Sequence, residues 1–120
     1  ATGIATTYYA GDGHSGSTLG CVAESRRLFG SSRFRLGLPV VATRGVPRCG
    51  TLVVVENART GARALAIRAD AGPYGCYRDS GRTVELRCSN GRRAAIADLT
   101  ERVAQEIGAR GHEKVRLRWR

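Results

Sequence analysis

The sequence has few aromatic residues and no long apolar stretch. Only 6% of its 120 residues are aromatic, and the run Leu52–Val55 has the length of a buried strand. A helix needs about 20 consecutive apolar residues to cross a bilayer, so we expect a soluble protein without a membrane span. A chain of this length forms one domain over residues 1–120, with a thin core. We expect a monomer that needs covalent support.

Methionine is absent altogether, and no two cysteines form a Cys-x-x-Cys pair. An alanine at position 1 of a chain without methionine is what removal of a signal peptide would leave. Neither His14 nor His112 lies at zinc-finger spacing from a cysteine, so we expect disulfides and neither a metal nor a cofactor. Three pairings are open to the four cysteines, which are Cys21, Cys49, Cys76 and Cys88.

We favour the pairs Cys21–Cys49 and Cys76–Cys88, because the second pair closes a short segment rich in Gly, Ser and Arg. Each link would contribute roughly 3 to 4 kcal/mol in the chain-entropy model. Disulfides persist in oxidising compartments. We therefore expect a secreted or otherwise extracytoplasmic protein, in the periplasm or the cell wall.

Lysine is nearly absent too, yet the chain is strongly basic. Lys114 is the single lysine, and 20 basic residues against 10 acidic ones give a formal net charge of +10. Such a charge favours a polyanionic partner: an anionic cell-wall polysaccharide or peptidoglycan, an acidic protein such as a protease, or nucleic acid. The arginines are scattered and lack a row of base-stacking aromatic residues, which makes nucleic acid the weakest of these partners.

Apolar alternation along the chain predicts a mainly β fold. Asn57–Gly61 has the composition of a hairpin connection, and Gly11–Ser17 that of a surface loop. The expected strands are Ile4–Tyr9, Pro39–Thr43, Thr51–Glu56, Ala64–Ala69 and Lys114–Arg120, with a small ribbon at Thr83–Arg87 inside the segment that Cys76 and Cys88 bound. Strands of this number and length favour a small closed barrel.

One helix is expected, over Thr100–Ile107. Asp98 and Glu101 give its start signal and Gly108 its stop. In the final strand apolar residues alternate with arginines, so we expect one of its faces to be solvent-exposed and basic. The inward residues are Val115, Leu117 and Trp119, and the outward ones are Arg116, Arg118 and Arg120, which we expect to contact an anionic wall polymer.

Four short segments, in one order, resemble those of the double-psi β-barrel superfamily. Gly3–Tyr9 is similar to the Gly-x-Ala-Thr/Ser-x-Tyr start of expansins and rare lipoprotein A domains. Arg68–Tyr74 resembles the Asp-Arg-Gly-Pro-Phe/Tyr segment of rare lipoprotein A, Ala97–Thr100 resembles its Asp-Leu-Ser, and Lys114–Arg120 is similar to the closing strand of bacterial expansins. The resemblance implies a six-stranded double-psi β-barrel with one short helix and a disulfide-bounded insertion.

The same resemblance implies a secreted protein that binds or loosens cell-wall polysaccharide. Asp70 and Asp98 take the places of the families' essential aspartates, and protonating a glycosidic oxygen requires a carboxylic acid. They are our catalytic candidates for a lytic transglycosylase or glycoside hydrolase. Structural roles compete, since an aspartate before a helix is commonly its cap and one before Gly-Pro commonly forms an Asx turn. The expected substrate contacts are Thr6, Tyr8, Tyr9, Tyr74 and Arg68.

Departures from these families weaken the enzymatic interpretation. Thr43 or Arg44 stands where rare lipoprotein A enzymes carry a histidine, and neither transfers protons as an imidazole does. The 120 residues also hold no counterpart of the second, carbohydrate-binding domain of expansins. We therefore expect binding or loosening with weak or no lytic turnover.

A different class stays open. Cys21 and Arg48–Gly50 resemble the cysteine motifs of secreted actinobacterial papain inhibitors, which are double-psi barrels that block proteases through exposed loops. A rigid, disulfide-held scaffold suits inhibition because little order is lost on binding. The alternatives to a wall-binding protein are thus a protease inhibitor and an active lytic transglycosylase.

Overall fold

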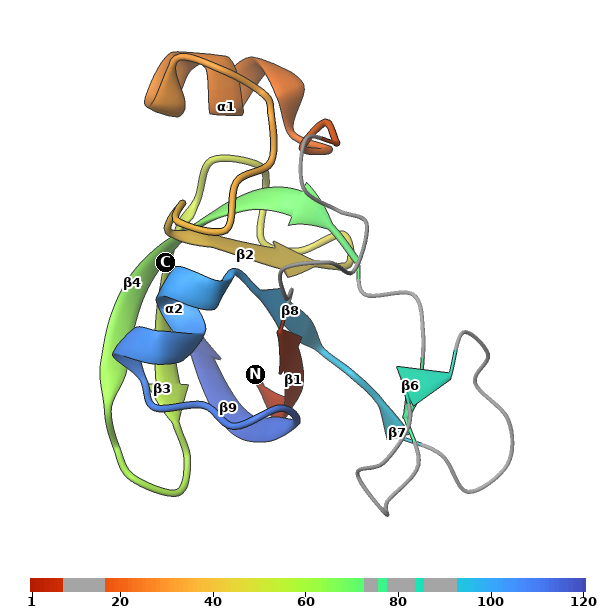
Figure 1. Cartoon of the computed structure of the whole chain (residues 1–120), viewed down its shortest axis with the longest axis vertical. Helices are drawn as coiled ribbons and strands as arrows, with labels where there is room; N and C mark the ends of the chain where they lie inside the picture. The colour runs from red at the N-terminus through yellow and green to blue at the C-terminus, as the bar shows by residue number, and fades with distance from the viewer. Residues whose placement is uncertain (8–16, 73–75, 78–83, 86–92) are drawn as a thin grey trace.

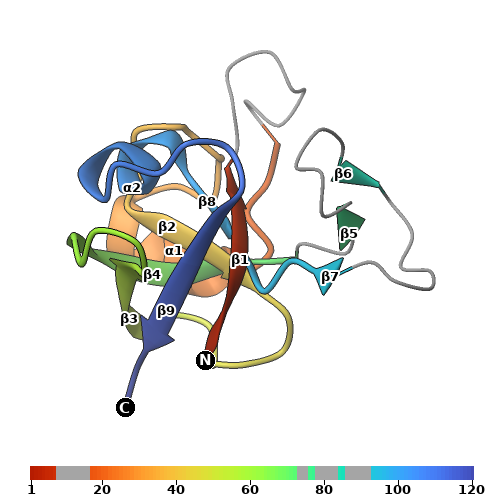
Figure 2. The same ribbon diagram turned by 90° about the horizontal axis from the view of Figure 1, so that it is seen from below.

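A closed barrel of six strands dominates the computed structural model (Figures 1 and 2). The structure describes residues 1–7, 17–72, 76–77, 84–85 and 93–120, with side chains for residues 1–7, 17–72 and 95–120. In barrel order the strands are β1 (Thr2–Thr7), β8 (Ala97–Leu99), β2 (Val40–Thr43), β4 (Arg63–Ala71), β3 (Leu52–Asn57) and β9 (Glu113–Arg118). The prediction of a mainly β, six-stranded barrel is confirmed.

The barrel mixes parallel and antiparallel pairs. β1 runs parallel to β8 and β2 runs parallel to β4, whereas the other neighbours are antiparallel. β3 and β4 form the predicted hairpin, and the Oδ1 atom of Asn57 holds its connection by accepting the N–H of Arg59 at 2.9 Å. β8 was not expected, because the sequence suggested that Asp98 starts a helix.

Three short strands form a separate sheet beside the barrel (Figure 2). They are β5 (Cys76–Tyr77), β6 (Val84–Glu85) and β7 (Arg93–Ala94), in the order β6-β5-β7. The ribbon expected at Thr83–Arg87 contains β6, and its other residues lie outside the described part of the chain.

Alternating apolar residues fill the barrel interior. Val115 and Leu117 of β9 point inward, as predicted, and pack with inward valines of β3. Trp119, also expected inward, is half-buried and packs against this core, while the outward arginines of β9 and the tail are exposed. The core cluster consists of Ala5, Val41, Val53, Val55, Ala64, Ala66, Ala97, Leu99, Val103, Ala104, Ile107, Val115 and Leu117.

A second buried cluster lies outside the barrel wall, between β2, β4 and the chain segment 17–38. Its members are Leu19, Phe34, Leu38, Val40, Ala42 and Ala69. The covering segment carries α1 (Val22–Phe29), which Figure 1 shows above β2 and β4. The outer face of β2 is therefore interior to the protein.

The prediction of a single helix was wrong, because α1 precedes the expected one. Its only buried residue is Ser25, so it lacks the apolar stripe by which helices are found in a sequence. Glu24 in its first turn and Arg26 in its last suit the helix dipole. Gly30 ends the helix at a φ of 75°, the left-handed conformation that favours glycine.

The expected helix is α2 (Glu101–Glu106), which lies within the predicted range. Thr100 occupies its N-cap position, but the buried hydroxyl of Thr100 donates to the carbonyl oxygen of Leu38 and accepts the N–H of Val40 at 3.3 Å. This hydroxyl fastens α2 to the start of β2.

The disulfide Cys21–Cys49 is present, as predicted, and joins the residue before α1 to the segment between β2 and β3. Cys88 lies outside the described residues, so the pair Cys76–Cys88 stays a prediction. Among the described residues, no helix has the length and apolar character required to cross a membrane.

Candidate functional site

Three of the predicted site residues lie in one row across the barrel wall. Thr6 of β1 pairs with Asp98 of β8, and Ala42 of β2 pairs with Asp98 on one side and with Asp70 of β4 on the other. Directly paired residues on neighbouring strands project from the same face of a sheet, as Thr6, Asp98 and Ala42 do. Asp70 joins the row at an irregularity of the ladder, because the register of β2 and β4 shifts between Val41 and Ala42. Since strands lie about 4.8 Å apart, two spacings place the Cα atoms of the two aspartates about 10 Å apart.

Asp70 uses one carboxylate oxygen to hold the backbone. Its Oδ1 atom accepts the N–H of Gly20 at 2.7 Å and the N–H of Ala71 at 2.9 Å. A Cβ atom at position 20 would lie 2.9 Å from that oxygen, so a larger residue there would displace the carboxylate of Asp70 from its present position. Asp70 thus anchors the segment that leads into Cys21 and the disulfide.

Asp98 faces away from the barrel interior. Its strand neighbours Ala97 and Leu99 are fully buried in the barrel core, whereas Asp98 is half-buried and its Oδ1 atom has almost no exposed surface. The helix-cap interpretation of Asp98 is wrong, because Thr100 occupies the N-cap of α2. Asp98 is a wall residue of the barrel.

Thr6 completes the row beside Asp98. Its side chain is buried, and its Oγ1 atom donates to the carbonyl oxygen of Ala97 at 3.4 Å. Tyr8, Tyr9 and Tyr74, the expected stacking residues, lie outside the described part of the chain.

Arg68 supports the scaffold from inside. The residue is only 7% exposed, and its Nε and Nη2 atoms donate to the hydroxyl and carbonyl oxygens of Thr43 at 3.2 and 3.0 Å. Its Nη1 atom donates to the sulfur of Cys49 at 3.0 Å and to that of Cys21 at 3.5 Å. A buried guanidinium must have its donors satisfied, and these bonds tie β4 to β2 and to the disulfide.

The position between the two aspartates is covered. Ala42 has no exposed surface and belongs to the second cluster, with Leu19 and Phe34. An inverting hydrolase holds its attacking water between two carboxyl groups 6.5 to 9.5 Å apart. Among the described residues, the buried Ala42 therefore leaves no open floor for an attacking water between Asp70 and Asp98.

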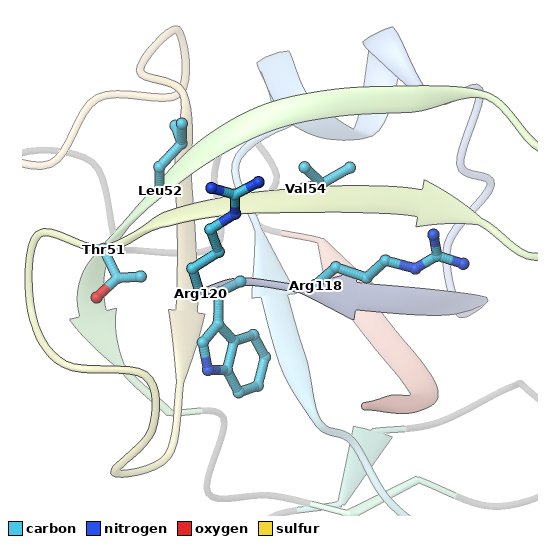
Figure 3. Close-up of a pocket in the computed structure, with 6 residues that line it drawn as sticks. Thr51, Leu52, Val54, Arg118 and Arg120 are labelled. Carbon is cyan, nitrogen blue, oxygen red and sulfur yellow. The ribbon is translucent and has the colours of Figure 1, made fainter.

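A second surface, which we call the β3–β9 groove, lies on the outer face of the barrel (Figure 3). It has a volume of about 390 Å³ and is lined by Thr51, Leu52, Val54, Arg118, Trp119 and Arg120. In Figure 3 the side chain of Arg120 points toward β3, while that of Arg118 extends along β9. The groove therefore has an aliphatic floor and a cationic border.

The outward arginines of this face differ in their partners. Arg116 donates to Glu56 at 3.0 Å, and Arg63 donates to the other oxygen of the same carboxylate at 3.0 Å. These two hydrogen bonds from Arg63 and Arg116 hold the pKa of Glu56 below its usual value. Within residues 1–7, 17–72 and 95–120, the side chains of Arg118 and Arg120 have no ion-pair partner.

Sequence reasoning identified these arginines but missed the groove. The available signal was Leu52, an exposed leucine at an outward position of a strand whose alternate residues, Val53 and Val55, face the core. Comparison with protein-family models and with curated proteins finds no match to this chain.

Proposed function

We propose that this chain is a secreted, double-psi-type barrel that binds cell-wall polysaccharide and cleaves it weakly or not at all. The observation that carries the proposal is the row formed by Thr6, Asp98 and Asp70. Three segments far apart in the sequence, each singled out for its motif, lie at one level of the barrel wall. A hydroxyl and carboxylates are suitable hydrogen-bonding partners for sugar hydroxyls.

The same row offers little for proton transfer. The Oδ1 atom of Asp70 accepts two backbone N–H groups, so this oxygen holds the backbone of Gly20 and Ala71. Thr43, at the place of the families' histidine, is buried and accepts a hydrogen bond from Arg68. Arg44 donates to the carbonyl oxygen of Ala95 at 3.0 Å. Neither side chain would serve as a general base or acid at neutral pH.

The net charge of +10 supports an anionic wall polymer as the partner. Attraction between exposed charges is screened over about 8 to 10 Å at physiological ionic strength, so retention on such a polymer should fall as salt is raised. A neutral glycan would be bound with little dependence on salt.

The test is retention on insoluble peptidoglycan with and without its anionic polymer, and on cellulose. We expect salt-sensitive retention on the anionic material, weakened by Asp98→Ala, which removes a hydrogen-bonding side chain from the row, and not weakened by Glu106→Ala, the same loss of a carboxylate on the exposed face of α2. Incubation with purified glycan strands should release no new reducing ends or anhydro-sugar termini above background. Equal retention of all variants would place the glycan elsewhere, and turnover abolished by Asp70→Asn or Asp98→Asn would make the protein a lytic enzyme.

Protease inhibition is the second candidate, and the segment between β2 and β3 favours it. Val46 is 65% exposed, and the segment is held at both ends, by Thr43 through Arg68 and by Cys49 through the disulfide. A loop that is ordered before binding loses little entropy when a protease takes it up. Inhibition of papain or trypsin that is lost in Val46→Asp would support this candidate over wall binding.

A further inference from the structure

The outer face of the β3–β4 hairpin carries a block of four aliphatic residues. By register, Leu52 pairs with Ile67 and Val54 pairs with Leu65, so the four side chains lie beside one another on one face. Leu52 is 53% exposed and Leu65 is 57% exposed. A contiguous exposed aliphatic patch on a small protein commonly marks a contact surface.

Cationic groups border this aliphatic block on its β9 side. Arg118 pairs by register with Val54, and Arg120 lines the same groove beside Leu52. One row away, Arg63 and Arg116 share the single carboxylate of Glu56, which lies between them and offsets one of their two charges. Among the described residues, Arg118 and Arg120 are therefore the cations beside the aliphatic floor that have no ion-pair partner.

The residue types of the groove are those that dominate protein contacts. Trp119, half-buried against the barrel core, forms one wall of the groove, and tryptophan and arginine are enriched among the residues that contribute most to binding. The volume of about 390 Å³ is within the range of specific pockets. A rigid barrel wall behind the groove means that little order is lost on binding.

We propose that the β3–β9 groove binds an acidic peptide segment of a partner protein, with aliphatic side chains on Leu52 and Val54 and carboxylates on Arg118 and Arg120. The Cα atoms of residues 118 and 120 lie at most about 7 Å apart, which is the interval between alternate side chains of an extended peptide. Nucleotide bases and sugar rings bind best on aromatic faces, and Trp119 is the one aromatic residue among the described residues that line the groove, whereas Leu52 and Val54 offer an aliphatic surface that suits aliphatic side chains. The inference is independent of the wall-binding row, which uses other strands.

The test is fluorescence anisotropy with a short labelled peptide in which glutamates alternate with leucines. We expect saturable binding that Arg118→Gln together with Arg120→Gln weakens about fivefold, and that Leu52→Thr weakens about threefold. Arg26→Gln, the same loss of charge on α1, should bind as the wild type does. Because these side chains are exposed, thermal unfolding of the variants should match that of the wild type.

Two control probes separate this site from general attraction to anions. Replacing the leucines of the peptide by serines, or its glutamates by glutamines, should abolish saturable binding. The proposal is overturned if the serine peptide binds as tightly, if Arg26→Gln weakens binding as much as the groove variants, or if no peptide binds. It is equally overturned if vesicles of anionic lipid or a second copy of the chain, detected by sedimentation, occupy the groove in preference to the peptide.

Discussion

Replacing both Cys21 and Cys49 by alanine should cost this small barrel a large part of its stability. The link closes a loop with a sequence separation of 28 residues, and the chain-entropy model then gives about 3.5 kcal/mol. Globular proteins unfold with an entropy of about 2.1 cal/mol/K per residue, so a loss of that size lowers Tm by about 14 °C in a chain of this length.

The contacts around the disulfide indicate that the loss of stability will be at least as large as the loop-closure value. The Nη1 atom of Arg68 donates to both sulfur atoms, and with alanines in their place it would be buried with one donor group unsatisfied. The serine variant of the same pair, which keeps an acceptor near Arg68, should lose less stability than the alanine variant.

The assay is thermal and urea unfolding of the wild type, the double alanine variant and the double serine variant. Substitution is cleaner than reduction, because a reductant would also open any link between Cys76 and Cys88. A fall in Tm of less than about 4 °C for the alanine variant, corresponding to about 1 kcal/mol, would refute the reasoning, since neither the loop closure nor the contacts of Arg68 would then matter.

Three further predictions concern the core, pH and the second disulfide. Phe34→Ala should destabilise the protein by about 3 to 5 kcal/mol in urea unfolding, because the ring is 2% exposed at the centre of the second cluster. The hydrogen bonds from Arg63 and Arg116 lower the pKa of Glu56 in the folded state, so ionised Glu56 stabilises the protein at pH values above its unfolded pKa of about 4.5. This stability is lost as the pH falls through the folded pKa. Glu56→Gln should therefore remove this part of the pH dependence of the urea unfolding midpoint. Peptide mapping of the native protein should link Cys76 with Cys88, and a peptide joining Cys76 to Cys21 would contradict the Cys21–Cys49 link as well.

The strands that alternate regularly were predictable from the sequence. In β9 the alternation of Val115 and Leu117 with arginines gives one buried and one exposed face, which is what a strand in a closed barrel requires. β3 and β4 were predictable for the same reason, together with the turn residues between them. Such strands are recognised from short-range pattern alone.

The elements that the sequence did not reveal depend on distant partners. α1 has no apolar stripe, and it is held at its start by Cys21 through the disulfide and at its end by Gly30. β8 has only three residues and is a strand because β1 pairs with it on one side and β2 on the other. Asp98, which the sequence suggested as the start of the helix, lies instead in β8, and α2 begins three residues later, at Glu101.

The candidate site, like the fold, could be predicted from the sequence only in part. Motifs located Thr6, Asp70 and Asp98, and the pairing of four strands places these residues in one row. No motif indicated that the backbone N–H of Gly20 would donate to the carboxylate of Asp70. Nor did any motif indicate that Ala42 would be buried under the second cluster. The covering of Ala42 comes from a segment that precedes it by some twenty residues and crosses the outer face of β2. That segment is itself anchored by Asp70, because the Oδ1 atom of Asp70 accepts the backbone N–H of Gly20. The hydrogen bond from Gly20 therefore gives this oxygen of Asp70 a role in holding the segment 17–38 against the barrel wall, a role that depends on a distant partner and leaves no signal in the motif.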